Sequence, residues 1–153
     1  MKRSQLLHAP LWLSLACALA SACGSSGSGS TTTNTGQACK TVADCYPGID
    51  AGALLGAPSC LTAVQNGYCT HHCASDDDCC AVPGECPNKL AQVCGPFEST
   101  GEMDCFLSCE DALVTQTGLS DANAFCAKYA NTTFICRSTG GGSLNRKVCV
   151  PNG

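Results

Sequence analysis

The sequence predicts a small disulfide-rich fold, built as an array of short β-hairpin and loop modules with one or two short helices toward the C-terminus. Cysteine is abundant, at 16 of 153 residues, and its spacing repeats, because the pattern of Cys39, Cys45 and Cys60 recurs 34 residues later. A fixed period of this kind is typical of arrayed modules. Aromatic residues make up only 5% of the chain. The expected apolar core is therefore thin, and covalent links must supply the missing stability.

The first element is a predicted signal peptide, residues 1–22. Lys2 and Arg3 precede an apolar stretch, residues 11–20, that is too short to span a membrane as an ordinary helix. This arrangement is typical of a leader that directs export and is then removed.

Cys23 is the predicted site of lipid attachment. The residues before it, Leu19-Ala20-Ser21-Ala22, resemble the lipobox of bacterial lipoproteins, in which the cysteine sulfur receives a diacylglycerol before cleavage ahead of it. Ala20 stands where Leu is usual, so cleavage after Ala22 by an ordinary signal peptidase is the alternative. Cysteine parity favours lipidation, because cleavage removes Cys17 and lipidation uses Cys23. Fourteen cysteines remain, an even number that can pair completely.

Residues 23–38 are predicted to form the anchor and a flexible tether, because residues 24–37 contain no large apolar side chain. About 15 residues of this composition reach about 20 Å. In the enterobacterial lipoproteins that the anchor resembles, Asp after the lipidated cysteine retains the protein in the inner membrane, so Gly24 implies transfer to the outer membrane. We expect the cell envelope, at the outer membrane or cell surface, with the periplasm or secretion as alternatives. The membrane, reached through the anchor, is the first expected partner.

The 14 remaining cysteines are predicted to form structural disulfides. Exported proteins fold in an oxidising compartment, and no Cys-x2-Cys pair, typical of zinc ribbons and thiol redox sites, occurs. They fall into three units, residues 39–72, 73–108 and 109–153, of which the third is diverged. These cysteines are Cys39, Cys45, Cys60, Cys69, Cys73, Cys79, Cys80, Cys86, Cys94, Cys105, Cys109, Cys126, Cys136 and Cys149.

Within each unit we predict that the first cysteine pairs with the third and the second with the fourth. Cys80 and Cys86 have no counterpart in the first unit. We expect them to pair with each other, because the step across Pro83-Gly84 can turn back within disulfide range.

Turn residues between the last two cysteines of each unit predict three hairpins. They lie at residues 65–67, 98–101 and 140–142. Asn66-Gly67 favours a tight type I′ turn, because both residues tolerate positive φ.

The third unit is predicted to contain a helix with Ser120 as the N-cap and Asp121 in the first turn. Its buried face comprises Ala122, Phe125, Cys126 and Tyr129. Because Gly118 interrupts the pattern, residues 110–117 are expected to form a separate short helix or a loop.

The run of Cys-x5-Cys, a spacer, a hairpin pair and Cys-x3-Cys resembles the repeats of cysteine-rich secreted lipoproteins of myxobacteria and related Gram-negative bacteria. The resemblance extends from Cys39 to Cys109. The resemblance implies where the protein is located and how its cysteine-rich units are arranged, but it implies no enzymatic reaction.

Charge is unevenly distributed. Residues 73–111 contain nine acidic residues against Lys89, whereas the C-terminal part is basic, with Lys128, Arg137, Arg146 and Lys147. A solvated surface is expected, with electrostatic contacts between units or a polar partner surface as alternatives. The net charge of −4 disfavours nucleic acid as a partner.

No metal site, cofactor or enzymatic activity is predicted. His71, His72 and residues 76–78 are the densest potential ligands, but adjacent side chains of an extended strand point in opposite directions. Catalytic motifs such as Gly-x-Ser-x-Gly do not occur. Cys79-Cys80 resembles the paired cysteines of secreted phospholipases, but Pro83 stands where their histidine is expected.

Two function classes remain. The favoured one is a surface-tethered, non-enzymatic binding or structural module whose partner is an unidentified protein or glycan. The alternative is a disulfide-stapled inhibitor of an extracellular hydrolase, with residues 81–87 or 95–104 as the candidate inhibitory loop.

Overall fold

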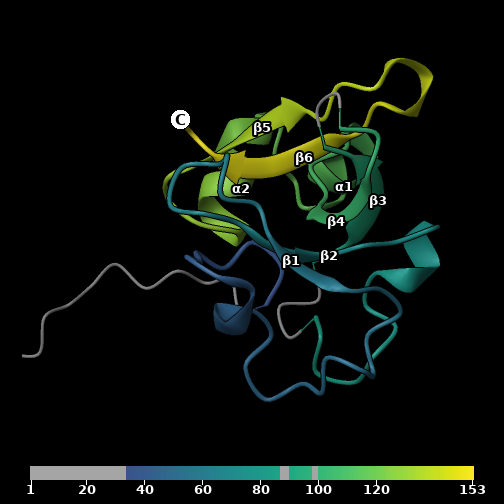
Figure 1. Ribbon diagram of the computed structural model, residues 1–153. Coiled ribbons are helices and arrows are strands. Elements are labelled where there is room, and N and C mark those ends of the chain that lie inside the picture. Colours follow the sequence, from purple (N-terminus) through teal and green to yellow (C-terminus); the bar gives the residue numbers. More distant parts are fainter. Residues whose placement is uncertain (1–33, 87–89, 98–99) are drawn as a thin grey trace, which may run out of the picture.

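Three antiparallel hairpins organise the structure, a computed structural model in which residues 34–86, 90–97 and 100–153 are described. The hairpins are β1 (Pro58–Cys60) with β2 (Cys69–His71), β3 (Gln92–Pro96) with β4 (Met103–Leu107), and β5 (Phe134–Ser138) with β6 (Lys147–Pro151) (Figure 1). Two helices, α1 (Asp111–Gln116) and α2 (Ala122–Tyr129), lie toward the C-terminal side. The predicted fold class is confirmed.

The cystines follow one plan in all three units. First-to-third and second-to-fourth pairing is confirmed in the bridges Cys39–Cys60, Cys45–Cys69, Cys73–Cys94, Cys79–Cys105, Cys109–Cys136 and Cys126–Cys149. The predicted extra bridge of the second unit, Cys80–Cys86, is also present.

The hairpin register explains this plan. In each hairpin the third and fourth cysteines of the unit lie directly opposite each other, as Cys60 with Cys69, Cys94 with Cys105, and Cys136 with Cys149. Opposite residues of an antiparallel pair point to the same face of the sheet. Both cystines therefore leave a hairpin on one side and fasten the segment that precedes it.

That preceding segment differs in the third unit. In the first two units a single-turn 3-10 helix, η1 (Val42–Asp44) or η2 (Asp76–Asp78), ends immediately before the second cysteine. In the third unit α1 and α2 take its place, and the second cysteine, Cys126, lies within α2. The longer gap between the first and second cysteines of the third unit, Cys109 and Cys126, thus accommodates these helical segments without changing the pairing of the cysteines.

The Asp that precedes the second cysteine has a structural role. The Oδ2 atom of Asp44 accepts the backbone N–H groups of the residues three and four positions earlier, at 2.9 and 2.8 Å. Asp78 does the same, at 2.9 and 2.7 Å. These backbone hydrogen bonds lower the pKa of both carboxyl groups.

Helix α2 begins one residue later than predicted. Its N-cap is Asp121 rather than Ser120, and the Asp121 carboxylate accepts the N–H groups of Asn123 (2.8 Å) and Ala124 (3.2 Å). A carboxylate at the positive end of a helix forms charge-assisted bonds that a serine hydroxyl cannot match. Of the two alternatives predicted for residues 110–117, a short helix or a loop, the helix is present as α1.

The first hairpin has a longer connection than the predicted two-residue turn. Asn66 and Gly67 do have positive φ (65° and 72°), but strand pairing stops at Cys60 and Cys69, so residues 61–68 form the loop. A Cβ atom at Gly67 would lie 2.0 Å from the carbonyl oxygen of Cys39. Glycine is therefore required there by close packing as well as by φ.

The predicted tether extends too far into the folded part, because Asn34, Thr35 and Gly36 are buried. The N–H of Gly36 donates to the carbonyl of Cys69 (2.9 Å), and the N–H of Cys69 donates to that of Gln37 (2.8 Å). The segment thus pairs with the start of β2 through backbone bonds, which need no apolar side chain. The remaining predicted tether, Cys23 and the signal peptide lie outside the described residues.

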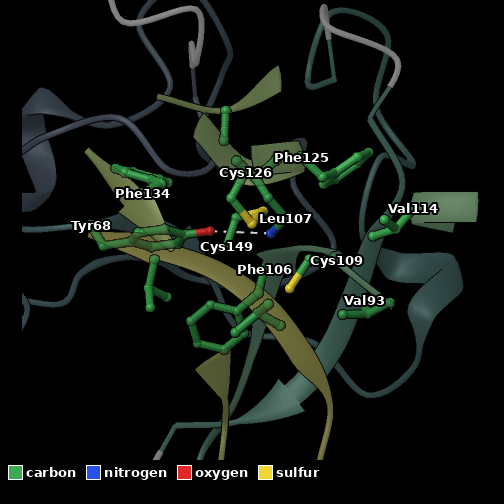
Figure 2. Close-up of a cluster of buried hydrophobic side chains, with 13 residues drawn as sticks. Tyr68, Val93, Phe106, Leu107, Cys109, Val114, Phe125, Cys126, Phe134 and Cys149 are labelled. Atoms are coloured by element: carbon green, nitrogen blue, oxygen red, sulfur yellow. Dashed lines mark hydrogen bonds between the residues drawn. A yellow bond between two sulfur atoms is a disulfide. The ribbon is translucent and has the colours of Figure 1, made fainter. Parts of the chain in front are cut away.

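One apolar core joins the three units. Tyr68, from the first unit, is fully buried, and its ring lies 5.5 Å from that of Phe106 in the second unit and 6.1 Å from that of Phe134 in the third (Figure 2). Its hydroxyl accepts the backbone N–H of Leu107 at 3.1 Å. Because their side chains pack in one core, the three hairpins stabilise one another.

Strand β4 is the centre of this arrangement. Isolated bridges connect His72 with Asp104 and Ser108 with Val148, so the chain at β4 contacts the first hairpin at one end and the third at the other (Figure 1).

Candidate binding surfaces

The uneven charge is partly used in contacts between units. Arg146 of the third unit donates to Asp76 Oδ1 (2.8 Å) in the second unit and to Glu110 Oε1 (2.6 Å). Glu110 belongs to the third unit itself, as do Lys147 and Asp111, which contact each other at 2.7 Å. Among these pairs, Arg146–Asp76 is the one that joins two units. The bonds to Glu110 and Asp76 raise the pKa of Arg146. Burial raises the pKa of Asp76, but hydrogen bonds from Arg146 and from the N–H of Cys94 outweigh burial and lower that pKa. The electrostatic alternative is therefore present alongside an otherwise solvated surface.

The histidines and aspartates considered as metal ligands have separate partners. His71 contacts Glu85, His72 contacts Asp104, and Asp76 contacts Arg146. Their contacts hold elements of the fold together, and the structure does not bring them into one group.

His71 and Glu85 form a fully buried pair between β2 and the loop at residues 80–86. The Nδ1 atom of His71 donates to the carbonyl of His72 at 2.8 Å, since a carbonyl can only accept. The Nε2 atom lies 2.8 Å from Glu85 Oε1. The carboxylate also accepts the N–H groups of Cys80 (2.8 Å) and Val82 (3.1 Å), so it is satisfied on both oxygens.

The second pair, His72 with Asp104, lies closer to the surface. Asp104 is buried, its Oδ1 atom lies 3.0 Å from His72 Nδ1, and the imidazole is 41% exposed. Burial raises the pKa of Asp104. Such a pair could orient a histidine as a general base, but the described hydrogen bonds of His72 reach no hydroxyl or thiol that it could activate.

The loop at residues 80–86 is exposed and rigid. The Cys80–Cys86 bridge closes it, Glu85 fastens it from inside, and the side-chain amide of Asn34 donates to the carbonyls of Gly84 and Glu85, each at 2.9 Å. Between these fastenings Ala81, Pro83 and Gly84 are exposed. The N–H of Glu85 donates to the carbonyl of Val82 (3.0 Å), so the tip of the loop is a tight turn.

A cavity of about 130 Å³ lies where the three units meet. The first unit contributes Val64, the second contributes Phe97 and Phe106, and the third contributes Arg137, Val148 and Val150. The sequence does not predict this site. Because residues so distant in the chain line it, no local motif marks it.

The cysteine sulfurs also cluster, since in each unit three of them lie within 4.8 Å of one another. All of these sulfurs belong to disulfides. A disulfide offers no thiolate to a metal or a substrate.

The structure thus defines a small disulfide-rich protein with three similarly bridged units around a shared core. Comparison with protein-family models, curated proteins and solved structures finds no match. The resemblance to myxobacterial lipoproteins stays a prediction. Within the described residues, none of the helices is long and apolar enough to cross a membrane.

Proposed function

We propose that the protein is a lipid-anchored, non-enzymatic binding module of the bacterial cell envelope, held at the outer membrane or cell surface. The observation that supports binding is the cavity built jointly by the three units. Its walls are held in place by the six repeated cystines and the shared core, so little chain ordering is required when a ligand binds.

The cysteine count supports the anchor. The 14 cysteines of the described units are all paired. Lipidation would use the one other cysteine that remains after removal of the leader, Cys23. Seven disulfides are also typical of exported proteins.

The inhibitor alternative receives less support. A substrate-like inhibitory loop must lie extended in the groove of its hydrolase. The tip of the 80–86 loop is instead folded into a turn, with Gly84 at φ 87°. In the other candidate loop, residues 95–96 and 103–104 belong to the paired strands β3 and β4.

Replacing Cys23 with alanine should convert a membrane-bound protein into a soluble one, because the acyl chains supply the membrane affinity. Cell fractionation followed by detergent extraction measures this. Cys17→Ala is the matched control, since Cys17 is removed with the leader, and that variant should stay in the membrane fraction. Retention of Cys23→Ala in the membrane fraction to the wild-type extent would contradict the anchor.

A further inference from the structure

We propose that the cavity at the meeting point of the three units binds a carboxylate that carries one six-membered ring or a branched group of similar size. This inference rests on the proposed binding function and assigns it a ligand class. Three observations lead to it: the size of the cavity, its apolar floor, and the unpaired cation at its edge.

The cavity volume restricts the ligand to one small group. Pockets for drug-sized ligands measure roughly 300–1,000 Å³, whereas this cavity measures about 130 Å³. An apolar cavity of about 150 Å³ accommodates benzene. One ring or one branched aliphatic group therefore fills the available space.

The floor of the cavity is mostly apolar. Its buried polar residue, Thr139, already accepts the N–H of Arg146 through its hydroxyl at 3.0 Å, and the polar lining residues Gln65 and Ser138 are exposed. Phe106 is fully buried, and Val148 and Val150 are nearly so. A charged group placed against these side chains would lose its hydration without gaining a partner. The apolar end of the ligand must consequently face the floor, and its charged end must lie toward the edge.

Arg137 lies at this edge and is free to bind an anion. Its side chain is exposed, and it forms no ion pair with any of the described residues, including Gly153, which also lines the cavity. The other C-terminal cations are engaged: Arg146 and Lys147 form ion pairs, and the amine of Lys128 lies 5.0 Å from the ring centre of Tyr129.

The β5–β6 register places cation and floor together. Arg137 lies opposite Val148, and Val150 follows two residues later. Opposite residues, and residues two apart on one strand, share a face of the sheet. The guanidinium can thus meet a carboxylate through two parallel N–H···O bonds while the apolar group rests on the valines.

Two kinds of ligand carry these groups: a free aromatic or branched carboxylic acid, and the C-terminal residue of a peptide. Both carry a carboxylate close to one apolar group. The test therefore uses phenylacetate as the free acid and N-acetyl-Gly-Phe as the peptide end, each beside its uncharged amide.

The experiment is an NMR titration of the full chain carrying Cys23→Ala, which avoids detergent and leaves residues 34–153 unchanged. We expect saturable shifts at Arg137, Val148 and Val150, with a dissociation constant of about 1 mM for a ligand of about ten heavy atoms. The amides should bind at least about tenfold more weakly, because they lose a charge-assisted bond. Tighter binding of the peptide assigns the site to chain ends, and tighter binding of phenylacetate assigns it to free acids.

Arg137→Gln, an exposed substitution, should weaken phenylacetate binding at least about tenfold. Lys40→Gln removes an exposed cation elsewhere and should leave binding unchanged. Equal binding of acid and amide, unchanged binding by Arg137→Gln, or no saturable shift up to about 20 mM, some twentyfold above the expected constant, would overturn the proposal. Since this titration does not involve the lipid anchor, its failure is distinguishable from failure of the fractionation experiment.

Discussion

Replacing Glu85 with alanine should lower the free energy of unfolding by about 3–5 kcal/mol, the usual effect of removing one partner of a buried ion pair. The substitution leaves His71 Nε2 buried without its partner and removes the acceptor for the N–H groups of Cys80 and Val82. The imidazole nitrogen then remains buried with an unsatisfied hydrogen bond, and the two partly buried N–H groups lose their acceptor. Guanidinium chloride unfolding followed by circular dichroism measures the loss.

Glu102→Ala is the matched control, because Glu102 is exposed and substitutions of this kind usually change stability by less than about 0.5 kcal/mol. Glu85→Gln should lie between wild type and Glu85→Ala, since one acceptor oxygen remains. The buried pair predicts a loss several times larger than about 1 kcal/mol. If the free energy of unfolding of Glu85→Ala lies within about 1 kcal/mol of the wild-type value, the pair does not fasten the loop to β2.

The second large effect concerns the central unit. Replacing Cys79 and Cys105 together should cost about 3.5 kcal/mol, and replacing Cys80 and Cys86 together about 2.2 kcal/mol, because the loss of chain entropy grows with the loop that a bridge closes. The bridged residues are 26 positions apart in the first case and 6 in the second. Lost packing increases the difference in stability between the two double variants, because Cys79 and Cys105 are buried whereas Cys80 is exposed.

Denaturant unfolding of the two double variants, with peptide mapping of the remaining bridges, measures this difference. We expect the Cys80/Cys86 variant to retain the other six bridges in register. A reversed order of stabilities, or exchanged bridges in the Cys80/Cys86 variant, would contradict the view that this bridge is an addition to a shared plan.

The cystine plan could be predicted because the sequence repeats. The offset of 34 residues assigns equivalent positions in the first two units, so Cys80 and Cys86 are identified as the unmatched pair. Turn residues then place a hairpin between the last two cysteines of each unit. Both signals are local, and neither requires knowledge of how the units pack.

Features that depend on packing between units could not be predicted. Glu85 gave no signal in the sequence, because its partner His71 lies 14 residues away in another unit. The predicted tether includes Asn34, because no local pattern indicates its two hydrogen bonds to residues 50 and 51 positions along the chain. Arg137 became a candidate only when its neighbours across the cavity were known.

Lipidation and complete disulfide pairing are tested most directly by the intact mass of the native protein, purified from membranes and treated with iodoacetamide with and without prior reduction. We expect a chain that begins at acylated Cys23, takes up no alkyl group when unreduced, and takes up 14 after reduction, one for each cysteine of the seven disulfides. A chain without acyl groups, or an unreduced chain that is alkylated, would contradict this expectation.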